Sequence, residues 1–172
     1  MSRTKEKDPM RQLLGKIARE RGKQFEGRID TALEYYATKG FAEIEKTPEP
    51  MRVTKNLGNG KFIAFFEKKA QPDYKGTLKG GRSIMFEAKF TASDRMEQSR
   101  VLDGQSNYMT RQQRLGARCY VVIGFQTMEV YRIPWEVWST MKEHFGRKYV
   151  TEADLKKYRV PTAWNGVLML LD

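Results

Sequence analysis

Two acidic residues and a lysine near the middle of the chain have the types and spacing of a site that binds a divalent metal ion. The sequence SIMFEAKF at Ser83–Phe90 is typical of a strand and carries Glu87 and Lys89, and Asp73 precedes it. Because side chains alternate across a strand, Glu87 and Lys89 share one face. The opposite face is apolar and consists of Ile84, Phe86, Ala88 and Phe90. The intervening glycines permit a tight return, so we expect Asp73 to lie beside Glu87.

Two converging carboxylates predict a bound cation, because they repel one another unless a positive charge lies between them. An all-oxygen site with open water positions suits Mg²⁺, with Mn²⁺ as a substitute, better than zinc. Asp73 and Glu87 are therefore the expected metal ligands, and Lys89 is expected to orient the attacking water and offset charge on the phosphorane. An exposed salt bridge on a strand face would explain the same residues, so spacing alone leaves both interpretations open.

The other reactive residue types exclude several chemistries. One cysteine and one histidine are too few for a zinc site or a disulfide. Cys119 lies in the apolar run CYVVIGF, which predicts a buried and inert thiol, and His144 is interpreted as a solvated side chain. No glycine-rich phosphate loop precedes a helix as in nucleotide-binding folds. Catalysis must therefore use carboxylates, lysines and a hard metal.

The charge of the chain indicates a polyanionic partner. The 172 residues carry a formal net charge of +11, which favours nucleic acid through counterion release. A merely soluble basic protein, or one that contacts anionic membrane, is the alternative. No apolar run is long enough to span a bilayer and the first residues lack the apolar core of a signal peptide. We therefore expect a cytoplasmic protein without a membrane partner.

The elements that must position these residues alternate between helix and strand. We expect one nuclease domain over residues 23–172, preceded by a basic, partly disordered arm over residues 1–22. Helices are predicted over residues 23–39, 105–115 and 134–145. Strands are predicted over residues 41–46, 83–90, 118–125 and 129–133. This order is α/β and indicates a mixed sheet flanked by helices. Trp135 and Trp138 are interpreted as core or dimer contacts.

A projecting basic hairpin is expected over about residues 46–69. Its two extended stretches, 51–57 and 61–69, flank a Gly-Asn-Gly turn. From Lys46 to Arg82 there are nine Lys or Arg and three acids, so more than half of the net charge lies here. An ordinary solvated hairpin is the alternative. The expected phosphate contacts are Arg52, Lys55, Lys61, Lys68 and Lys75.

Three pieces of sequence resemble the RecU family of Holliday junction resolvases in their order and spacing. These pieces are GxxFE at Gly22–Glu26, DYxG at Asp73–Gly76 and FEAK at Phe86–Lys89, and the resemblance covers residues 22–149. It implies a homodimer with the restriction-endonuclease-like fold of the PD-(D/E)xK nucleases, whose stalk enters the centre of a four-way junction. The short chain suggests a phage-encoded member.

The resemblance also implies roles for individual residues. The catalytic core consists of Asp73, Glu87 and Lys89. Glu26 matches the family's helical carboxylate and takes a supporting or second-metal role, and the Ala88 carbonyl is a candidate third ligand. Gln105 matches a catalytic position, although Gly104 stands where the family usually has a histidine. Pro72 replaces a small hydroxyl residue.

The predicted function is paired, metal-dependent hydrolysis of a four-way junction during recombination and repair, leaving 5′-phosphates. Recombination or branch-migration proteins are the expected further partners. Two alternatives stay open. One is a nuclease of the same fold that acts on duplex ends, flaps or a short sequence. The other is a basic junction-binding accessory protein whose carboxylates are structural; it predicts that Asp73→Asn and Lys89→Ala leave activity unaltered.

Overall fold

A five-stranded mixed sheet forms the centre of the molecule. The computed structural model describes residues 8–66 and 71–172. The strand order is β1-β4-β5-β7-β8. These strands are β1 (Ala42–Lys46), β4 (Tyr74–Leu78), β5 (Ser83–Phe90), β7 (Arg118–Gly124) and β8 (Val130–Pro134). Only the β5–β7 pair in this sheet is parallel. The expected mixed α/β architecture is confirmed.

Apolar cores cover both faces of this sheet. Helix α1 (Pro9–Thr38) packs on the face that carries Ile84 and Phe86. Helices α2 (Asp103–Arg114), α3 (Trp135–Ser139) and α4 (Met141–Phe145) pack on the other face. The strand β5 therefore has the two-sided pattern that the sequence predicted, with Glu87 on the α2 side.

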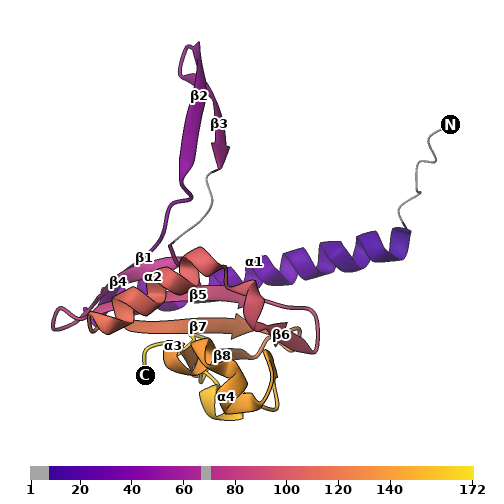
Figure 1. Cartoon of the computed structure of the whole chain (residues 1–172), viewed down its shortest axis with the longest axis vertical. Coiled ribbons are helices and arrows are strands. Elements are labelled where there is room, and N and C mark those ends of the chain that lie inside the picture. The colour runs from indigo at the N-terminus through magenta and orange to yellow at the C-terminus, as the bar shows by residue number, and fades with distance from the viewer. Residues whose placement is uncertain (1–7, 67–70) are drawn as a thin grey trace.

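The first helix begins earlier than the sequence predicted. We expected it to start at residue 23, but α1 runs without a break from Pro9, and the side chain of Asp8 accepts the N–H of Met10 at 3.0 Å. The glycines at positions 15 and 22 do not end it, because the strong helix formers around them offset a cost of about 1 kcal/mol for each glycine. The described part of the expected arm is thus helical, and it extends past the sheet (Figure 1). Residues 1–7 lie outside the described residues.

The hairpin projects from the body as predicted (Figure 1). Strand β2 (Met51–Gly58) pairs antiparallel with β3 (Lys61–Phe66) in a separate two-stranded sheet. Gly58, Asn59 and Gly60 all have positive φ, between 51° and 80°, which explains the glycines of this turn. The end of the second predicted stretch, residues 67–70 with Lys68, lies outside the described residues.

Several smaller elements differ from the prediction. The helix expected over residues 134–145 is divided at Thr140 into α3 and α4, and Pro134 precedes it as the N-cap. Strands β6 (Arg95–Glu97) and β9 (Tyr149–Thr151) form a second small sheet, with 3-10 turns at Gln98–Arg100 and Lys156–Tyr158. The short helix expected between residues 151 and 172 is the turn at Lys156–Tyr158. Strands β6 and β9 had not been expected, because each has only three residues and their pairing is nonlocal.

The residues that were assigned no chemistry lie as expected. Trp135 and Trp138 are buried in the core on the α2 side, and His144 is exposed on α4. Cys119 is buried, and burial raises the pKa of its thiol to about 12. None of the helices in the described part of the chain has both the length and the hydropathy needed to cross a bilayer.

Candidate active site

Asp73 and Glu87 lie opposite each other where strands β4 and β5 separate. The last pair of their antiparallel ladder at this end is Tyr74 with Phe86, so the next opposed positions are 73 and 87. Directly opposed residues of an antiparallel pair place their side chains on the same face. At the other end of the ladder, Gly80 and Gly81 have φ values of 92° and 87° and form the turn. Strand register thus produces the convergence that the sequence predicted.

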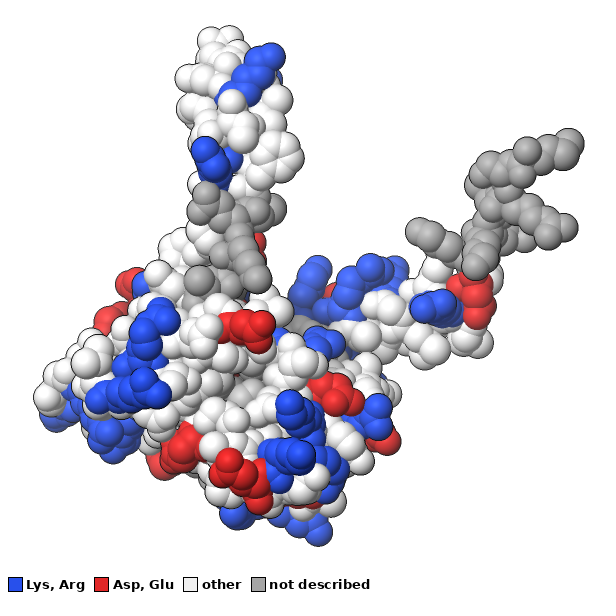
Figure 2. Space-filling view, in the orientation of Figure 1, with Lys and Arg blue, Asp and Glu red and all other residues white. Residues whose placement is uncertain are grey.

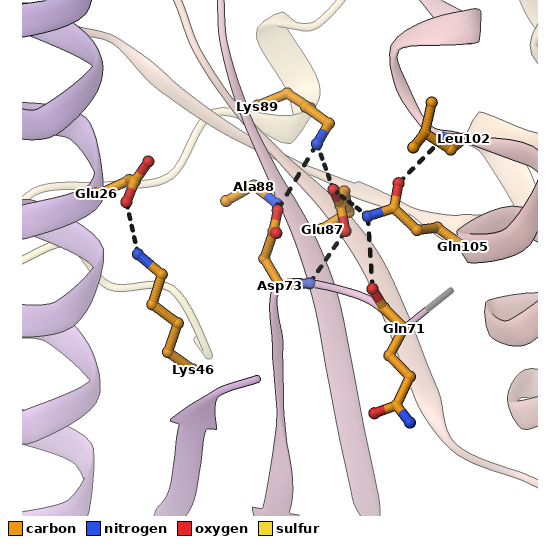
Figure 3. Close-up of polar contacts among 9 residues, drawn as sticks. All are labelled: Glu26, Lys46, Gln71, Asp73, Glu87, Ala88, Lys89, Leu102 and Gln105. Atoms are coloured by element: carbon orange, nitrogen blue, oxygen red, sulfur yellow. Dashed lines mark hydrogen bonds and ion pairs between the residues drawn. The ribbon is translucent and has the colours of Figure 1, made fainter. Parts of the chain in front are cut away.

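Pro72 explains why the ladder stops at this point. It follows in register opposite Ala88, and it has no N–H to donate. The Ala88 N–H instead donates to Oδ2 of Asp73 at 3.0 Å, and the Asp73 N–H donates to Oε2 of Glu87 at 3.0 Å (Figure 3). The N–H and C=O of one strand residue point to the same side. The Ala88 carbonyl, the candidate third ligand, therefore points to the side where Asp73 lies.

Glu87 is the most deeply buried of the three predicted core residues of the site. It is 0% exposed, although its place on the strand had predicted an open, reactive face. Its Oε1 accepts hydrogen bonds from Lys89 Nζ and, at 2.8 Å, from Gln105 Nε2 in the first turn of α2. The Gln105 amide is oriented in turn, because its Oε1 accepts the N–H of Leu102 at 3.1 Å. Gln105 is thus brought to the site as predicted, and it contacts Glu87 directly.

Lys89 lies between the two carboxylates. It pairs with Oε1 of Glu87, and its Nζ lies 3.8 Å from Oδ2 of Asp73. The side chains of Lys89 and Asp73 are 20% and 15% exposed. Lys89 and Asp73 are therefore partly accessible to solvent, whereas the side chain of Glu87 is not.

Burial raises the pKa of Glu87 to about 7. The ammonium of Lys89 lowers this pKa and the neighbouring Asp73 carboxylate raises it, but loss of hydration is the largest effect. Asp73 and Glu87 lie side by side, and Glu87 is shielded from water. A cation bound between them would therefore stabilise their ionised forms. Both donors are oxygen, so the residues present fit Mg²⁺ or Mn²⁺.

Glu26 does not join the two carboxylates in this structure. It lies on α1 and pairs with Lys46 Nζ at 2.6 Å, with both side chains half-exposed (Figure 3). Within residues 8–66 and 71–172, no three His, Cys, Asp or Glu side chains gather as a metal site. Lys46 is the last residue of β1, and sequence reasoning had not predicted that it pairs with Glu26.

The predicted phosphate contacts lie in two places. Arg52, Lys55 and Lys61 are exposed on the hairpin, whereas Lys75 is on β4 of the body and donates to Oε1 of Gln71 at 2.7 Å. Arg52 is paired with Phe65 and Lys55 with Ile63, so these cations share a face with apolar residues. Sequence reasoning missed the exposed apolar residues of the hairpin. They are Met51, Val53, Leu57, Phe62, Ile63 and Phe65.

The sequence is similar to those of known proteins from one family. Residues 20–171 match the family described as RecU, Recombination protein U. The Holliday junction resolvase RecU of Streptococcus gordonii is 32% identical over 124 residues, which cover 66% of this chain and 60% of that protein. The Holliday junction resolvase RecU of Streptococcus thermophilus is 31% identical over 121 residues, which cover 66% and 61%. The chain therefore spans about 60% of the length of these relatives.

Among solved structures, a match is Hjc of Archaeoglobus fulgidus, a Holliday junction resolvase. It has 13% sequence identity and a TM-score of 0.46, and the alignment covers 80% of this chain and 88% of that one.

Proposed function

Because the chain belongs to the family of Recombination protein U, we propose that it is a metal-dependent endonuclease that resolves four-way DNA junctions. The relatives that it matches are named Holliday junction resolvases. The observation that carries the proposal is the opposed pair Asp73 and Glu87 with Lys89 between them. The reaction is paired hydrolysis of phosphodiesters in recombination and repair, and it leaves 5′-phosphates.

Asp73 and Glu87, with the Ala88 carbonyl, would hold Mg²⁺, for which Mn²⁺ would substitute. When bound, the ion supplies positive charge that polarises the phosphodiester and acidifies a water molecule. The fully oxygen donor set and the raised pKa of Glu87 support this assignment. Glu26, half-exposed on α1 beside Lys46, is available for a supporting role.

Lys89, Gln105 and Glu87 each have a separate role in the proposed reaction. Lys89 is the partly exposed cation of the site, and its ammonium donates to the attacking water and to the phosphate oxygens as negative charge grows there. Gln105 touches Glu87 and holds its carboxylate toward Asp73, so it acts as a positioning residue. Glu87 must be ionised to bind a cation, which requires a pH near or above its raised pKa.

Junction shape, rather than base identity, would be recognised by the projecting hairpin. Its exposed cations Arg52, Lys55 and Lys61, together with Lys68 of the sequence, contact phosphates, and Lys75 does so beside the catalytic residues. Two symmetric cuts require two sites, so the working unit is a homodimer with one site in each chain. We place this enzyme in the cytoplasm with its DNA, where recombination or branch-migration proteins would be its partners.

A cleavage assay tests the proposal. Labelled four-way junction, linear duplex and flap of matched sequence are incubated with the protein in Mg²⁺, in Mn²⁺ and in EDTA. We expect symmetric nicks in the junction alone, only with a divalent ion, and products with 5′-phosphates. Equal cutting of linear duplex would overturn the junction specificity. Junction binding without cutting in every divalent ion would instead identify an accessory protein.

A further inference from the structure

We propose that a second basic surface binds the phosphate backbone of a junction arm about four base pairs from the cleaved bond, an inference that rests on the proposed function. This distal patch lies at the end of the sheet opposite the catalytic carboxylates. It consists of Lys79, Arg82, Arg111, Arg114 and Arg118. Figure 2 shows Lys and Arg side chains gathered at that end of the body, over the β4–β5 turn and the end of α2.

Three of the five cations line one pocket. Lys79 and Arg82 come from the β4–β5 turn and Arg118 from the start of β7, around a cavity of about 400 Å³. Arg82 Nε also donates to the carbonyl of Gly116 at 2.9 Å, in the loop that follows α2. This bond joins the pocket to the last turn of α2, which contributes Arg111 and Arg114. The patch is therefore a continuous surface built from three elements.

The cations of the patch lack carboxylate partners. Among the residues that the structure describes, none of the five forms an ion pair. Other arginines, at positions 95, 147 and 159, each pair with a carboxylate at 2.9 Å or less. Asp172 also lines the pocket and contributes one negative charge against three positive ones, and it forms no ion pair with the described cations of the patch. Exposed cations that are clustered and not neutralised attract a polyanion.

Helix α2 sets the distance between the patch and the catalytic residues. Gln105 in its first turn contacts Glu87, and its last turn carries Arg111 and Arg114. Gln105 and Arg114 are nine residues apart, which is about 14 Å along a helix. Along β5, Ser83 and Glu87 are four residues apart, which is about 13 Å. At about 3.4 Å per base pair, these lengths correspond to roughly four base pairs of duplex. The patch can thus hold the same arm that enters the active site.

A binding experiment with a matched control tests the inference. The patch variant carries Lys79→Gln, Arg114→Gln and Arg118→Gln, and it spares Arg82 because of its bond to Gly116. The control variant removes three exposed charges elsewhere, on α4 and in the 3-10 turn near the C-terminus. Its substitutions are Lys142→Gln, Lys156→Gln and Lys157→Gln. The affinity for a synthetic four-way junction is measured in EDTA as a function of salt concentration.

We expect the patch variant to bind more weakly and its plot of log affinity against log salt to flatten by about 0.9 for each phosphate that it no longer neutralises. The control variant should keep the wild-type slope. Ethylation of phosphates about four nucleotides from the cut should interfere with binding by the wild-type protein and not with binding by the patch variant. Single-turnover cleavage by saturating patch variant should stay at the wild-type rate, because the catalytic residues are untouched.

The outcomes separate the two proposals. If the wild-type protein cuts the junction but the patch and control variants have equal salt slopes, the distal patch is wrong and the proposed function stands. A lower Tm with an unchanged slope would identify the patch as structural and would also overturn the inference. If the wild-type protein neither binds nor cuts the junction, the proposed function fails and the patch fails with it.

Discussion

The backbone N–H of Asp73 donates to Oε2 of Glu87 at 3.0 Å, one position beyond the last pair of the β4–β5 ladder. The carboxylate of Asp73 in turn accepts the N–H of Ala88. The N–H groups just beyond the ladder are therefore satisfied by carboxylate oxygens, at the point where Pro72 has no N–H for a further ladder bond. The same local break in the sheet fixes the two carboxylates beside each other.

Asp73→Asn should separate cleavage from binding. The amide oxygen of asparagine can still accept the Ala88 N–H, so the fold is kept while the charge is removed. We expect wild-type junction affinity in EDTA and loss of cleavage in Mg²⁺. Lys89→Ala should lower the single-turnover rate by at least about 10²-fold, also with junction binding retained. Both variants cutting at the wild-type rate would show that these residues are structural.

Gln105→Ala should weaken binding of the divalent ion. The substitution removes the hydrogen bond from Gln105 Nε2 to Oε1 of Glu87. The Glu87 carboxylate is then less firmly held in position. A residue that hydrogen-bonds to a metal ligand typically contributes about 10- to 100-fold to the affinity for the metal. We expect a rise of that size in the dissociation constant for Mn²⁺ by calorimetry, with cleavage recovering at high Mn²⁺. The control is Gln112→Ala, two turns along the same helix; an equal effect of both substitutions would contradict a specific role for Gln105.

The stability of the metal-free protein should depend on the ionisation of Glu87. Its folded-state pKa of about 7 exceeds the ordinary value of 4.5, so the folded state favours the protonated form. This contribution is complete below pH 4.5 and is lost as the pH rises through about 7. Relative to Glu87→Gln, the wild-type free energy of unfolding in EDTA should fall by on the order of 3 kcal/mol across this window. A constant difference from pH 4 to 8 would show that Glu87 does not titrate as stated.

Gly76→Ala should destabilise the sheet, whereas Gly15→Ala should not. A Cβ at position 76 would lie 1.9 Å from the carbonyl oxygen of Glu43 on β1, so one strand must move. We expect a loss of about 3 kcal/mol or more in chemical denaturation. At position 15 a Cβ meets nothing within 4 Å, and alanine in a helix gains up to about 1 kcal/mol. Equal stability of the two variants would contradict the close approach of β1 and β4.

Replacement of residues 51–66 by a short Gly-Ser linker should leave the body folded. In the described part of the chain, β2 and β3 contact mainly each other. We expect the free energy of unfolding to change by no more than about 0.5 kcal/mol. Affinity for the four-way junction should fall to that for linear duplex of the same length, because the cations of the hairpin are no longer there to bind phosphates. Unchanged preference for the junction would place shape recognition elsewhere.

Much of the fold was predictable because it depends on local patterns. The bounds of β5, the faces of its side chains and the Gly-Asn-Gly hairpin turn follow from alternation and turn chemistry. The start of α1 was not predictable from glycines alone, since two isolated glycines weaken a long helix without ending it. The pairing of β6 with β9 depends on residues more than 50 positions apart, which no local pattern records.

The sequence by itself determined which residues could form the site: Glu87 and Lys89 share a face because they are two positions apart on a strand, and Asp73 can return to them through glycines. Only the tertiary structure decided how they are used. Packing of α2 buries Glu87 and brings Gln105 into contact with it, while Glu26 on α1 pairs with Lys46 instead. The reason is that burial, and with it the raised pKa, depends on register and packing between distant segments.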